Sequence, residues 1–368
     1  MPPRPVKRGT LASIAADLGI SRTTVSNAYN HPDQLSPELR EKILAAAAAR
    51  GYSGPDPMAR SLRTRRVGSF GVLLTEQLSF AFEDLASIEF LAGLAASSFG
   101  KRNSMTLVPV GPHDEDSTQT VQQAVVDGFV VYSVAADDRH LAAARARQLP
   151  IVIVDQPYDI FDLPYVGIDD RVAIQPAAQA LIDAGHRRVG ILTKRIHQER
   201  MDGPVTAEQI ETAELHVQRA RVQGAIEAFE AAGITEVPVI SRHFNDHAAA
   251  VDAAREMLEC HPEVTAILCT TDSMAFGVLD YCAAQGIDVP GQLSVTGFDG
   301  VELAHVRGLT TVNQPNRRKG AMVGKILEEL VDAYVNDHAP ADPTPRVVIP
   351  TTFTPGQTVA APRNSALA

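Results

Sequence analysis

Three short apolar runs in the sequence each end in polar residues that can bind a small polar molecule. The runs at 151–154, 266–269 and 293–298 are followed or closed by Asp155, by Thr270, Thr271 and Asp272, and by Asp299. Apolar runs of this length are typical of buried strands in parallel sheets, and ligands of such sheets lie at the carboxyl ends of the strands. No nucleophile–base pair and no G-x-S-x-G elbow accompanies these residues, which argues against catalysis.

Near the N-terminus, polar side chains follow Ser21 at helical spacing. Arg22, Thr23, Ser26 and Asn27 fall on the exposed turns of a short helix. Arg can bond a guanine edge through two hydrogen bonds, Asn can do so with adenine, and Thr can contact a thymine methyl. For Arg22, a phosphate contact is nearly as good an interpretation as base recognition. This pattern predicts a helix that enters the major groove of DNA.

Two helices joined by a glycine turn must position these side chains. Thr10 can cap a helix over 11–18, Gly19 supplies the positive φ of a tight turn, and Ser21 caps a second helix over 22–30. Helices joined in this way form a helix-turn-helix. A third helix is expected to begin at the pair Ser36–Pro37 and to end near Gly51.

Residues 10–52 resemble the DNA-binding headpiece of the LacI/GalR (lactose-repressor) family. They read TLASIAADLGISRTTVSNAYNHPDQLSPELREKILAAAAARGY and contain the core A-x-x-x-G-[VI]-S-x-x-T-V-S. The resemblance places Arg22 and Thr23 at the main specificity positions. Asn27 stands where the family more often has Arg, so the operator preference of a relative does not transfer. The DNA contacts expected in the headpiece come from Thr10, Ser21, Arg22, Thr23, Ser26, Asn27, Asn30 and Tyr52.

Residues 54–66 match the hinge helix of this family, which pairs with its copy in the minor groove. Leu62 matches the leucine that wedges into the central base step, and we expect further contacts from Ala59 and Arg63. The alternative is that Leu62 only seals a linker. A dense arginine cluster around it favours DNA, and so short a helix should fold only when it is paired on DNA.

Beyond residue 66, apolar strands alternate with helices, which predicts parallel sheets covered on both faces. Strands are expected at 69–74, 104–110, 128–132, 151–154, 188–192, 239–241, 266–269 and 293–297. Helices are expected at 88–100, 172–184, 219–232, 248–260, 274–285 and 316–335. So many strands over some 300 residues suit two similar lobes. The predicted fold is an all-α helix-turn-helix headpiece followed by an α/β, doubly wound, periplasmic-binding-protein-like sensor.

The same family resemblance extends over the sensor through the strings VDQP, GHRRVGIL, RARVQGAIEAF, CTTDSMAFGVL, SVTGFD and LTTVNQP. It implies that the effector is held by Arg221, Thr271 and Asp299, with Asp155 and Gln314 as weaker matches. An Arg fork with carboxylates on opposing lobes suits vicinal hydroxyls or a polar ring.

Other interpretations of these residues stay open. Asp155 could instead hold the interlobe hinge, and Asp272 is expected to cap a helix starting at Ser273. Thr271 departs from the usual Asn or Asp of the family. The segment 193–214 is longer than the corresponding family loop and is expected to overhang or reshape the cleft, so the ligand need not be a simple hexose.

Composition limits the remaining classes of function. The total formal charge is −11, yet residues 1–66 carry eleven Lys/Arg against five Asp/Glu, so the rest carries −17. A basic segment on an acidic body suits DNA contact by the N-terminal end alone. Three cysteines form no CxxC pair, and no phosphate loop or membrane span is evident. A zinc site from His243, His247 and Cys260 is a remote alternative, and no cofactor is expected.

The domains are therefore expected to be a headpiece (1–53), a hinge (54–66), a two-lobed effector-binding and dimerisation domain (67–360) and a disordered tail (361–368). We expect a cytoplasmic homodimer on a palindromic operator, since one helix-turn-helix reads too few bases. A sugar-like small molecule controls it, and the resemblance favours repression. The tail lacks leucine heptads, so a tetramerising coiled coil is not expected. A transport solute-binding protein and an α/β enzyme are the rival classes.

Overall fold

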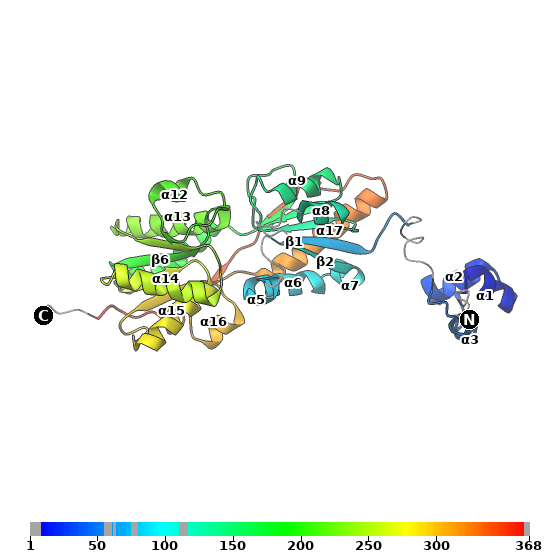
Figure 1. Ribbon diagram of the computed structural model, residues 1–368, viewed down its shortest axis with the longest axis horizontal. Helices are drawn as coiled ribbons and strands as arrows, with labels where there is room; N and C mark the ends of the chain where they lie inside the picture. The colour runs from blue at the N-terminus through cyan, green and yellow to red at the C-terminus, as the bar shows by residue number, and fades with distance from the viewer. Residues whose placement is uncertain (1–8, 55–60, 62–63, 75–79, 110–116, 364–368) are drawn as a thin grey trace, which may run out of the picture. The chain divides into compact units, whose positions relative to one another are not determined.

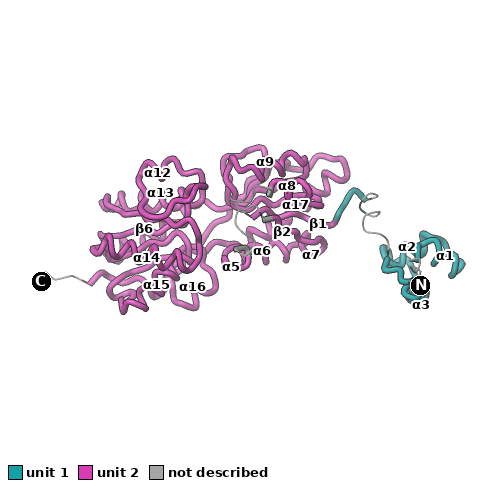
Figure 2. The backbone as a smooth tube through the Cα atoms, in the orientation of Figure 1, with its two compact units in different colours: residues 1–67 teal, residues 68–368 magenta. Residues whose placement is uncertain are grey.

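The computed structural model describes residues 9–54, 61, 64–74, 80–109 and 117–363. Two compact units divide the chain at residues 1–67 and 68–368 (Figure 2). Three residues with an expected DNA contact, Ala59, Leu62 and Arg63, lie outside the described residues, as do residues 364–368 of the expected tail.

The first unit is a helix-turn-helix followed by a third helix. Its elements are α1 (Leu11–Leu18), α2 (Arg22–Asn30), a single 3-10 turn (Pro32–Gln34) and α3 (Pro37–Ala49). The side chains of Thr10, Ser21 and Ser36 cap the three helices, and Gly19 ends α1 at a φ of 63°. Ile14, Val25 and Ile43 form a small buried core, so the expected helix bounds and caps are confirmed.

Two sheets organise the second unit, each with helices on both faces (Figure 1). The first sheet has the strand order β12-β5-β4-β3-β1-β2 and is parallel in every described pairing. The second has the order β13-β11-β10-β9-β6-β8-β7, and its edge strands β13 and β7 are antiparallel to their neighbours.

The strands run over β1 (Ser69–Leu74), β2 (Ser104–Pro109), β3 (Phe129–Tyr132), β4 (Ile151–Val154), β5 (Tyr165–Gly167), β6 (Val189–Lys194), β7 (Gly203–Pro204), β8 (Val239–Arg242), β9 (Ala266–Cys269), β10 (Ser294–Asp299), β11 (Thr310–Asn313), β12 (Arg346–Val348) and β13 (Thr352–Thr354). The helices are α5 (Phe80–Glu83), α6 (Leu85–Ala96), α7 (Ser98–Arg102), α8 (Ser117–Gln123), α9 (Arg139–Ala146), α10 (Asp170–Ala173), α11 (Gln175–Asp183), α12 (Ala207–Glu211), α13 (His216–Ala231), α14 (His247–Cys260), α15 (Asp272–Gln285), α16 (Glu302–Val306) and α17 (Asn316–Val335).

All eight predicted strands are present, with bounds shifted by two residues at most. Two predicted helices are each divided. The helix expected at 88–100 breaks at Ser97, whose extended backbone and side-chain hydroxyl cap α7. The helix expected at 172–184 breaks at Ile174. Pro176 lies in the first turn of α11 and has no backbone N–H, so it cannot donate the hydrogen bond that would continue one helix through this point. Five short strands, β5, β7, β11, β12 and β13, were not predicted.

The second unit consists of two lobes that the chain visits alternately. Residues 68–167 and 316–349 build the first lobe around the first sheet, and residues 168–313 and 352–363 build the second lobe. Within the described chain, three connections therefore cross between them: one after β5, one after β11 and one after β12. The first two lead directly into α10 and α17, so they place residues of these helices at the boundary between the lobes.

Helices α6 and α17 pack closely in the first lobe because both carry glycine at the contact (Figure 1). A Cβ on Gly320 would lie 2.2 Å from the Phe90 carbonyl oxygen and 2.5 Å from the Leu94 nitrogen. Both are backbone atoms, so neither can move aside without shifting α6. Glycine in a helix interior costs about 1 kcal/mol relative to alanine. This cost is offset here by the close approach that it permits.

We predict that Gly320→Ala lowers the free energy of unfolding, despite the better helix propensity of alanine, by roughly 1–3 kcal/mol through the backbone overlap. Equilibrium denaturation in urea measures this. The control is Ala321→Ser at the exposed neighbouring position, which should change stability by less than about 0.5 kcal/mol. An equal or higher stability for Gly320→Ala would contradict the packing argument.

Candidate functional site

Helix α2 presents its first turn to solvent. Arg22 and Thr23 are exposed there, directly after Ser21, whose hydroxyl accepts from the Thr24 backbone nitrogen at 3.0 Å. At the start of α1, the Thr10 hydroxyl accepts from the Ser13 nitrogen at 3.1 Å. Because Ser21 caps the helix, the exposed side chains of Arg22 and Thr23 are not needed for that purpose. They can therefore extend into a DNA groove.

The second turn of α2 is held by side-chain amides. Asn27 donates to the Gln34 side-chain oxygen at 3.0 Å, and Asn30 donates to the Ser26 hydroxyl at 3.0 Å. Tyr52 is half-buried against Tyr29, with ring centroids 5.9 Å apart in an edge-to-face arrangement. Gln34 was not predicted from the sequence, although it orients Asn27. Its position in a short 3-10 turn gives no periodic signal.

The second unit holds a polar pocket between its lobes, and all five predicted effector residues line it. The first lobe contributes Asp84, Ala86, Ser87, Tyr132, Ser133, Asp155 and Gln156, and the second contributes Lys194, Arg195, Leu215, Val217, Gln218, Arg221, Thr271 and Asp299, with Gln314 on the connection between them. The cavity volume is about 60 Å³, which accommodates a few water molecules.

Arg221 lies at the centre of the site on α13 and is 4% exposed. Its Nε donates to Asp170 Oδ1 at 2.7 Å, and its Nη1 donates to the Thr270 carbonyl at 2.8 Å. Asp299 Oδ1 lies 3.6 Å from Nη1, and the guanidinium carbon lies 3.8 Å from the centre of the Phe298 ring. Two carboxylates and one aromatic face therefore fix the orientation of the guanidinium.

Asp155 and Asp299 are joined through Lys319 and Gln314. Lys319 Nζ donates to both carboxylate oxygens of Asp155 at 2.9 Å and to Gln314 Oε1 at 2.8 Å. Gln314 Nε2 in turn donates to Asp299 Oδ1 at 2.6 Å. We call the resulting series the interlobe polar chain; it consists of Asp155, Lys319, Gln314, Asp299, Arg221 and Asp170, and it connects the two lobes without interruption.

The backbone at two of these positions is strained. Asp155 has a φ of 62° and Asp299 a φ of 130°, values that residues with a side chain rarely adopt. Tyr165 donates its hydroxyl to the Asp155 carbonyl at 3.1 Å, and the Asp272 nitrogen lies 3.4 Å from Asp299 Oδ2. Strain of this kind persists where surrounding contacts enforce it, and it is common at ligand sites.

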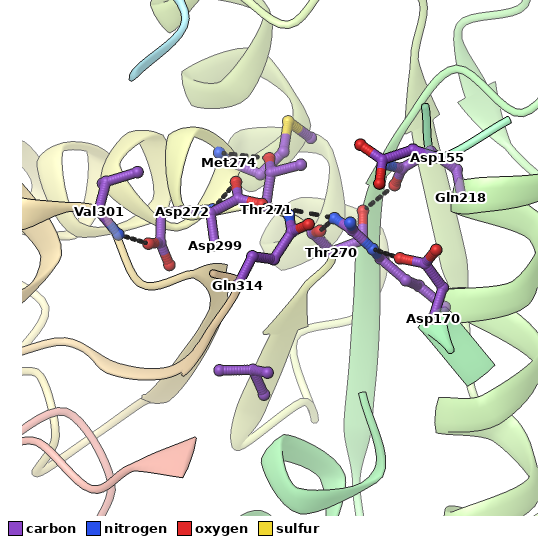
Figure 3. Close-up of polar contacts among 12 residues, drawn as sticks. Asp155, Asp170, Gln218, Thr270, Thr271, Asp272, Met274, Asp299, Val301 and Gln314 are labelled. Carbon is purple, nitrogen blue, oxygen red and sulfur yellow. Dashed lines mark hydrogen bonds and ion pairs between the residues drawn. The ribbon is translucent and has the colours of Figure 1, made fainter. Parts of the chain in front are cut away.

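Two side chains that the sequence did not predict in the site are Asp170, which accepts from Arg221, and Gln218 (Figure 3). Gln218 accepts hydrogen bonds from Thr193 at 3.2 Å and from Thr270 at 2.6 Å. Lys319 was also not predicted, although it is fully buried. Asp170 and Lys319 lie in first turns of helices, where a polar residue is normally read as solvent-exposed, so sequence patterns do not single them out.

The expected role of Asp272 is wrong. Helix α15 begins at Asp272 itself, and its cap is Thr271, whose hydroxyl accepts from the Met274 nitrogen at 3.2 Å. The carboxylate of Asp272 instead accepts from the Thr311 hydroxyl of β11 at 2.6 Å. It also accepts from the backbone nitrogen of Val301, just after β10, at 3.0 Å (Figure 3). The helix therefore starts one residue earlier than predicted, and Thr271 both caps it and lines the pocket.

The long segment 193–214 is divided between two places. Its first residues, Lys194 and Arg195, line the pocket, and Gln198 donates to Asp137 of the first lobe at 2.9 Å. Its middle forms β7, which pairs with β8 at the edge of the second sheet. Only the start of the segment therefore lines the cleft, while its middle extends the sheet and its later part forms α12.

Burial dominates the protonation of the carboxylates around Arg221. It raises the pKa of Asp299 to about 7, while the nearby Arg221 lowers it and Asp272 raises it further. Burial likewise raises the pKa of Asp170 to about 6, against the opposing effect of Arg221. Both carboxylates therefore bind protons more readily in the folded chain than in water.

Among the described residues, no three His, Cys, Asp or Glu side chains are grouped so as to hold a metal ion. His247 lies 3.7 Å from Asp280, and Cys260 is exposed at the other end of the same helix. None of the helices in the described part of the chain is long and apolar enough to cross a membrane.

Comparison with known proteins places this arrangement among transcriptional regulators. Residues 178–359 match the periplasmic binding protein-like domain. The chain is 52% identical to the HTH-type transcriptional regulator IpsA of Corynebacterium glutamicum, over 96% of this chain and 98% of the relative. A crystal structure of a LacI-family transcriptional regulator from the same organism matches with a TM-score of 0.73 and 48% identity, over 96% of this chain and 99% of that one.

The fold is also that of the lac repressor dimer solved with operator and the anti-inducer ONPF. That match has a TM-score of 0.73 over 96% of this chain and 100% of the other. The sequence identity is 21%, so the likeness concerns the fold alone.

The raised pKa of Asp299 predicts how Asp299→Asn responds to pH. In the unfolded chain the carboxyl loses its proton near pH 3.8, whereas in the folded chain it does so near 7. Between these two values the unfolded chain is ionised while the folded chain keeps its proton, so this carboxyl loses its stabilising contribution as the pH rises from about 4 to about 7. An asparagine does not ionise, so the free energy of unfolding of Asp299→Asn, relative to the parent, should increase between about pH 4 and about pH 7 and then level off. Urea denaturation at several pH values tests this, and a pH-independent difference would contradict it.

Proposed function

Because the chain belongs to the LacI family of transcriptional regulators, we propose that it represses transcription as a homodimer on a palindromic operator, under the control of a small polar effector. That the chain is a DNA-binding transcriptional regulator, and not an enzyme, follows from its relatives. Repression, the dimer, the operator symmetry and the effector class are the proposal. One observation carries it: a helix-turn-helix unit and a polar pocket between two lobes occur in one chain.

A sugar or related polyol is the effector that the pocket chemistry favours. Arg221, Gln218 and Lys194 offer donors, and Asp155 and Asp299 offer acceptors, all within one polar cavity. Vicinal hydroxyls both donate and accept, so they can satisfy such a mixed set, whereas an apolar ligand would leave buried groups unpaired.

The lobes must move for such a ligand to bind. A cavity of about 60 Å³ is well below the roughly 300–1,000 Å³ of typical small-molecule sites. Three connections between the lobes provide the hinge, as in other two-lobed binding proteins. We propose that the effector changes the angle between the lobes and thereby the pairing of residues 54–66 on DNA. It can do so only by binding the two states with different affinity.

Within the DNA interface, we assign base recognition to Arg22 and Thr23 and phosphate contact to Thr10 and Ser21, whose hydroxyls also cap their helices. Asn27, Ser26, Asn30 and Tyr52 support the recognition surface. The wedge role of Leu62, with contacts from Ala59 and Arg63, stays part of the proposal. A periplasmic solute-binding protein shares the sensor fold, but the helix-turn-helix unit disfavours that alternative.

We predict that selection of random duplex DNA on the full-length protein enriches a palindrome with an easily kinked central step. Arg22→Ala should then relax the preference at one base pair in each half-site by about 1–3 kcal/mol, because the bidentate contact is lost. Competition binding at fixed salt measures this. Uniform weakening across all sequences would instead assign Arg22 to a phosphate, and enrichment of no sequence, with or without added metabolite extract, would refute the operator proposal.

Arg221→Lys should abolish the effector response while operator binding persists. Lysine keeps the charge but cannot bond Asp170 and the Thr270 carbonyl together, so the donors facing the pocket lose their orientation. Fluorescence anisotropy of labelled operator, titrated with a panel of monosaccharides and cyclic polyols, gives the readout. The matched control is Arg255→Lys, an ion-paired but half-exposed arginine on α14. A parental response in Arg221→Lys would remove this residue from the site.

A further inference from the structure

Helix α13, which carries Arg221, does not supply its own N-terminal cap. Leu215 stands at the N-cap, and its aliphatic side chain cannot accept a hydrogen bond. The backbone N–H groups in the first turn of an α-helix have no acceptor within the helix, and those that are buried need one from elsewhere. Val217 lies in this turn and is 7% exposed. An acceptor must therefore reach it from another part of the chain.

The first lobe provides this acceptor. Gln156, two residues after β4, places its Oε1 3.0 Å from the Val217 nitrogen and accepts the hydrogen bond. The Nε2 of the same carboxamide donates to the Ser133 carbonyl of the first lobe at 3.2 Å. Gln156 is 4% exposed, so bulk water competes little for either contact. The carboxamide is thus oriented within the first lobe and caps a helix of the second.

A second contact crosses between the lobes beside this cap. The ring of Tyr158 stacks on the ring of His216, the first residue of α13, with centroids 4.9 Å apart and an angle of 11° between the ring planes. We call the two contacts, Gln156 to Val217 and Tyr158 to His216, the interlobe clasp. Both are made within the chain itself, so the clasp closes without any ligand.

The clasp bears directly on the effector pocket. Gln156 and Val217 both line the interlobe pocket, and Arg221 follows Val217 by four residues, so these two lie on one face of α13. Holding the first turn of this helix against the first lobe therefore holds the guanidinium of Arg221 against the pocket. Separation of the lobes would leave a buried N–H and a carboxamide oxygen without their partner, which costs free energy unless water replaces both contacts.

We propose that Gln156 is a positioning residue for the effector: by capping α13 from the opposite lobe, it keeps the empty pocket closed and Arg221 in place. The interlobe clasp then reduces the fraction of chains that are open to a ligand, and the apparent affinity falls by that same fraction. The inference rests on the proposed function in one respect, namely that the interlobe pocket is where the effector binds.

Opening of the lobes can be measured without an effector. Ala86 on α6 of the first lobe lines the interlobe pocket, and it belongs to an apolar cluster whose other buried members all lie in the second lobe. The thiol introduced by Ala86→Cys should react with N-ethylmaleimide only when the lobes separate, because the reagent is larger than a few water molecules. The buried Cys269 and Cys282 report global unfolding, and the exposed Cys260 reacts at once. Mass spectrometry of peptides separates the four thiols.

Gln156→Met, made in the Ala86→Cys protein, keeps the length of the side chain but removes the acceptor. We expect the introduced thiol to react roughly tenfold faster, which corresponds to the loss of one buried hydrogen bond, while Cys269 and Cys282 react as before. The matched control is Thr206→Val, which removes the side-chain cap of α12 within the second lobe. It should leave the rate unchanged, because that cap does not cross between the lobes.

An unchanged rate in folded Gln156→Met would overturn the proposal. An equal acceleration of Cys269 and Cys282 would also overturn it, since Gln156 would then act on global stability alone. If Gln156→Met does not fold, Tyr158→Leu removes the stacking contact of the clasp, and we expect roughly threefold faster labelling; an unchanged rate there would be equally decisive against the clasp. The assay contains neither DNA nor effector, so a failure here leaves the operator selection, and with it the proposed function, to be judged separately.

Discussion

A lysine ammonium group that is wholly removed from water must be matched by acceptors, and Lys319 obtains them only where the two lobes meet. Asp155 belongs to the first lobe, and Gln314 lies on a connection to the second. Removing one partner of such a buried pair costs about 3–5 kcal/mol, because the other charge is left uncompensated. The relative position of the two lobes is therefore fixed by the electrostatic contacts of the interlobe polar chain as well as by packing. A ligand that inserts hydroxyls into this chain must replace the contacts that it breaks.

The carboxyl groups around Arg221 outnumber the cations that face them, and burial raises their pKa values. Replacing them with well-packed apolar groups would often be neutral or favourable for folding. The presence of these carboxyl groups lowers folding stability, and it fits a site whose polar groups must be available to bind a ligand. The strained backbone of Asp155 and Asp299 belongs to the same pattern, since both residues sit at strand ends where the chain turns sharply to present a carboxylate.

Much of this organisation could be predicted from the sequence because it depends on local patterns. The capping residues predicted the three helices of the headpiece. The apolar runs predicted the main strands and the polar residues at their ends. Lys319 and Asp170 could not be found in this way, since their charged partners, Asp155 and Arg221, lie far away in the sequence. The short strands β5 and β12 were missed for a related reason: each is three residues long and is stabilised by the sheet edge that it joins. The cap of α15 is Thr271 and not Asp272 because helix starts are ambiguous by one residue.

The order in which the chain enters the lobes has a consequence for synthesis on the ribosome. The first lobe begins at residue 68, but α17 and β12, which complete its core and its sheet, follow only after residues 168–313 of the second lobe. Most of the second lobe is thus inserted between the two parts of the first lobe, and only its edge strand β13 follows β12. During translation the inserted part can begin to pack while the first lobe still exposes the apolar face that α17 will cover. The half-finished first lobe is therefore the stage at which the nascent chain most needs protection from aggregation.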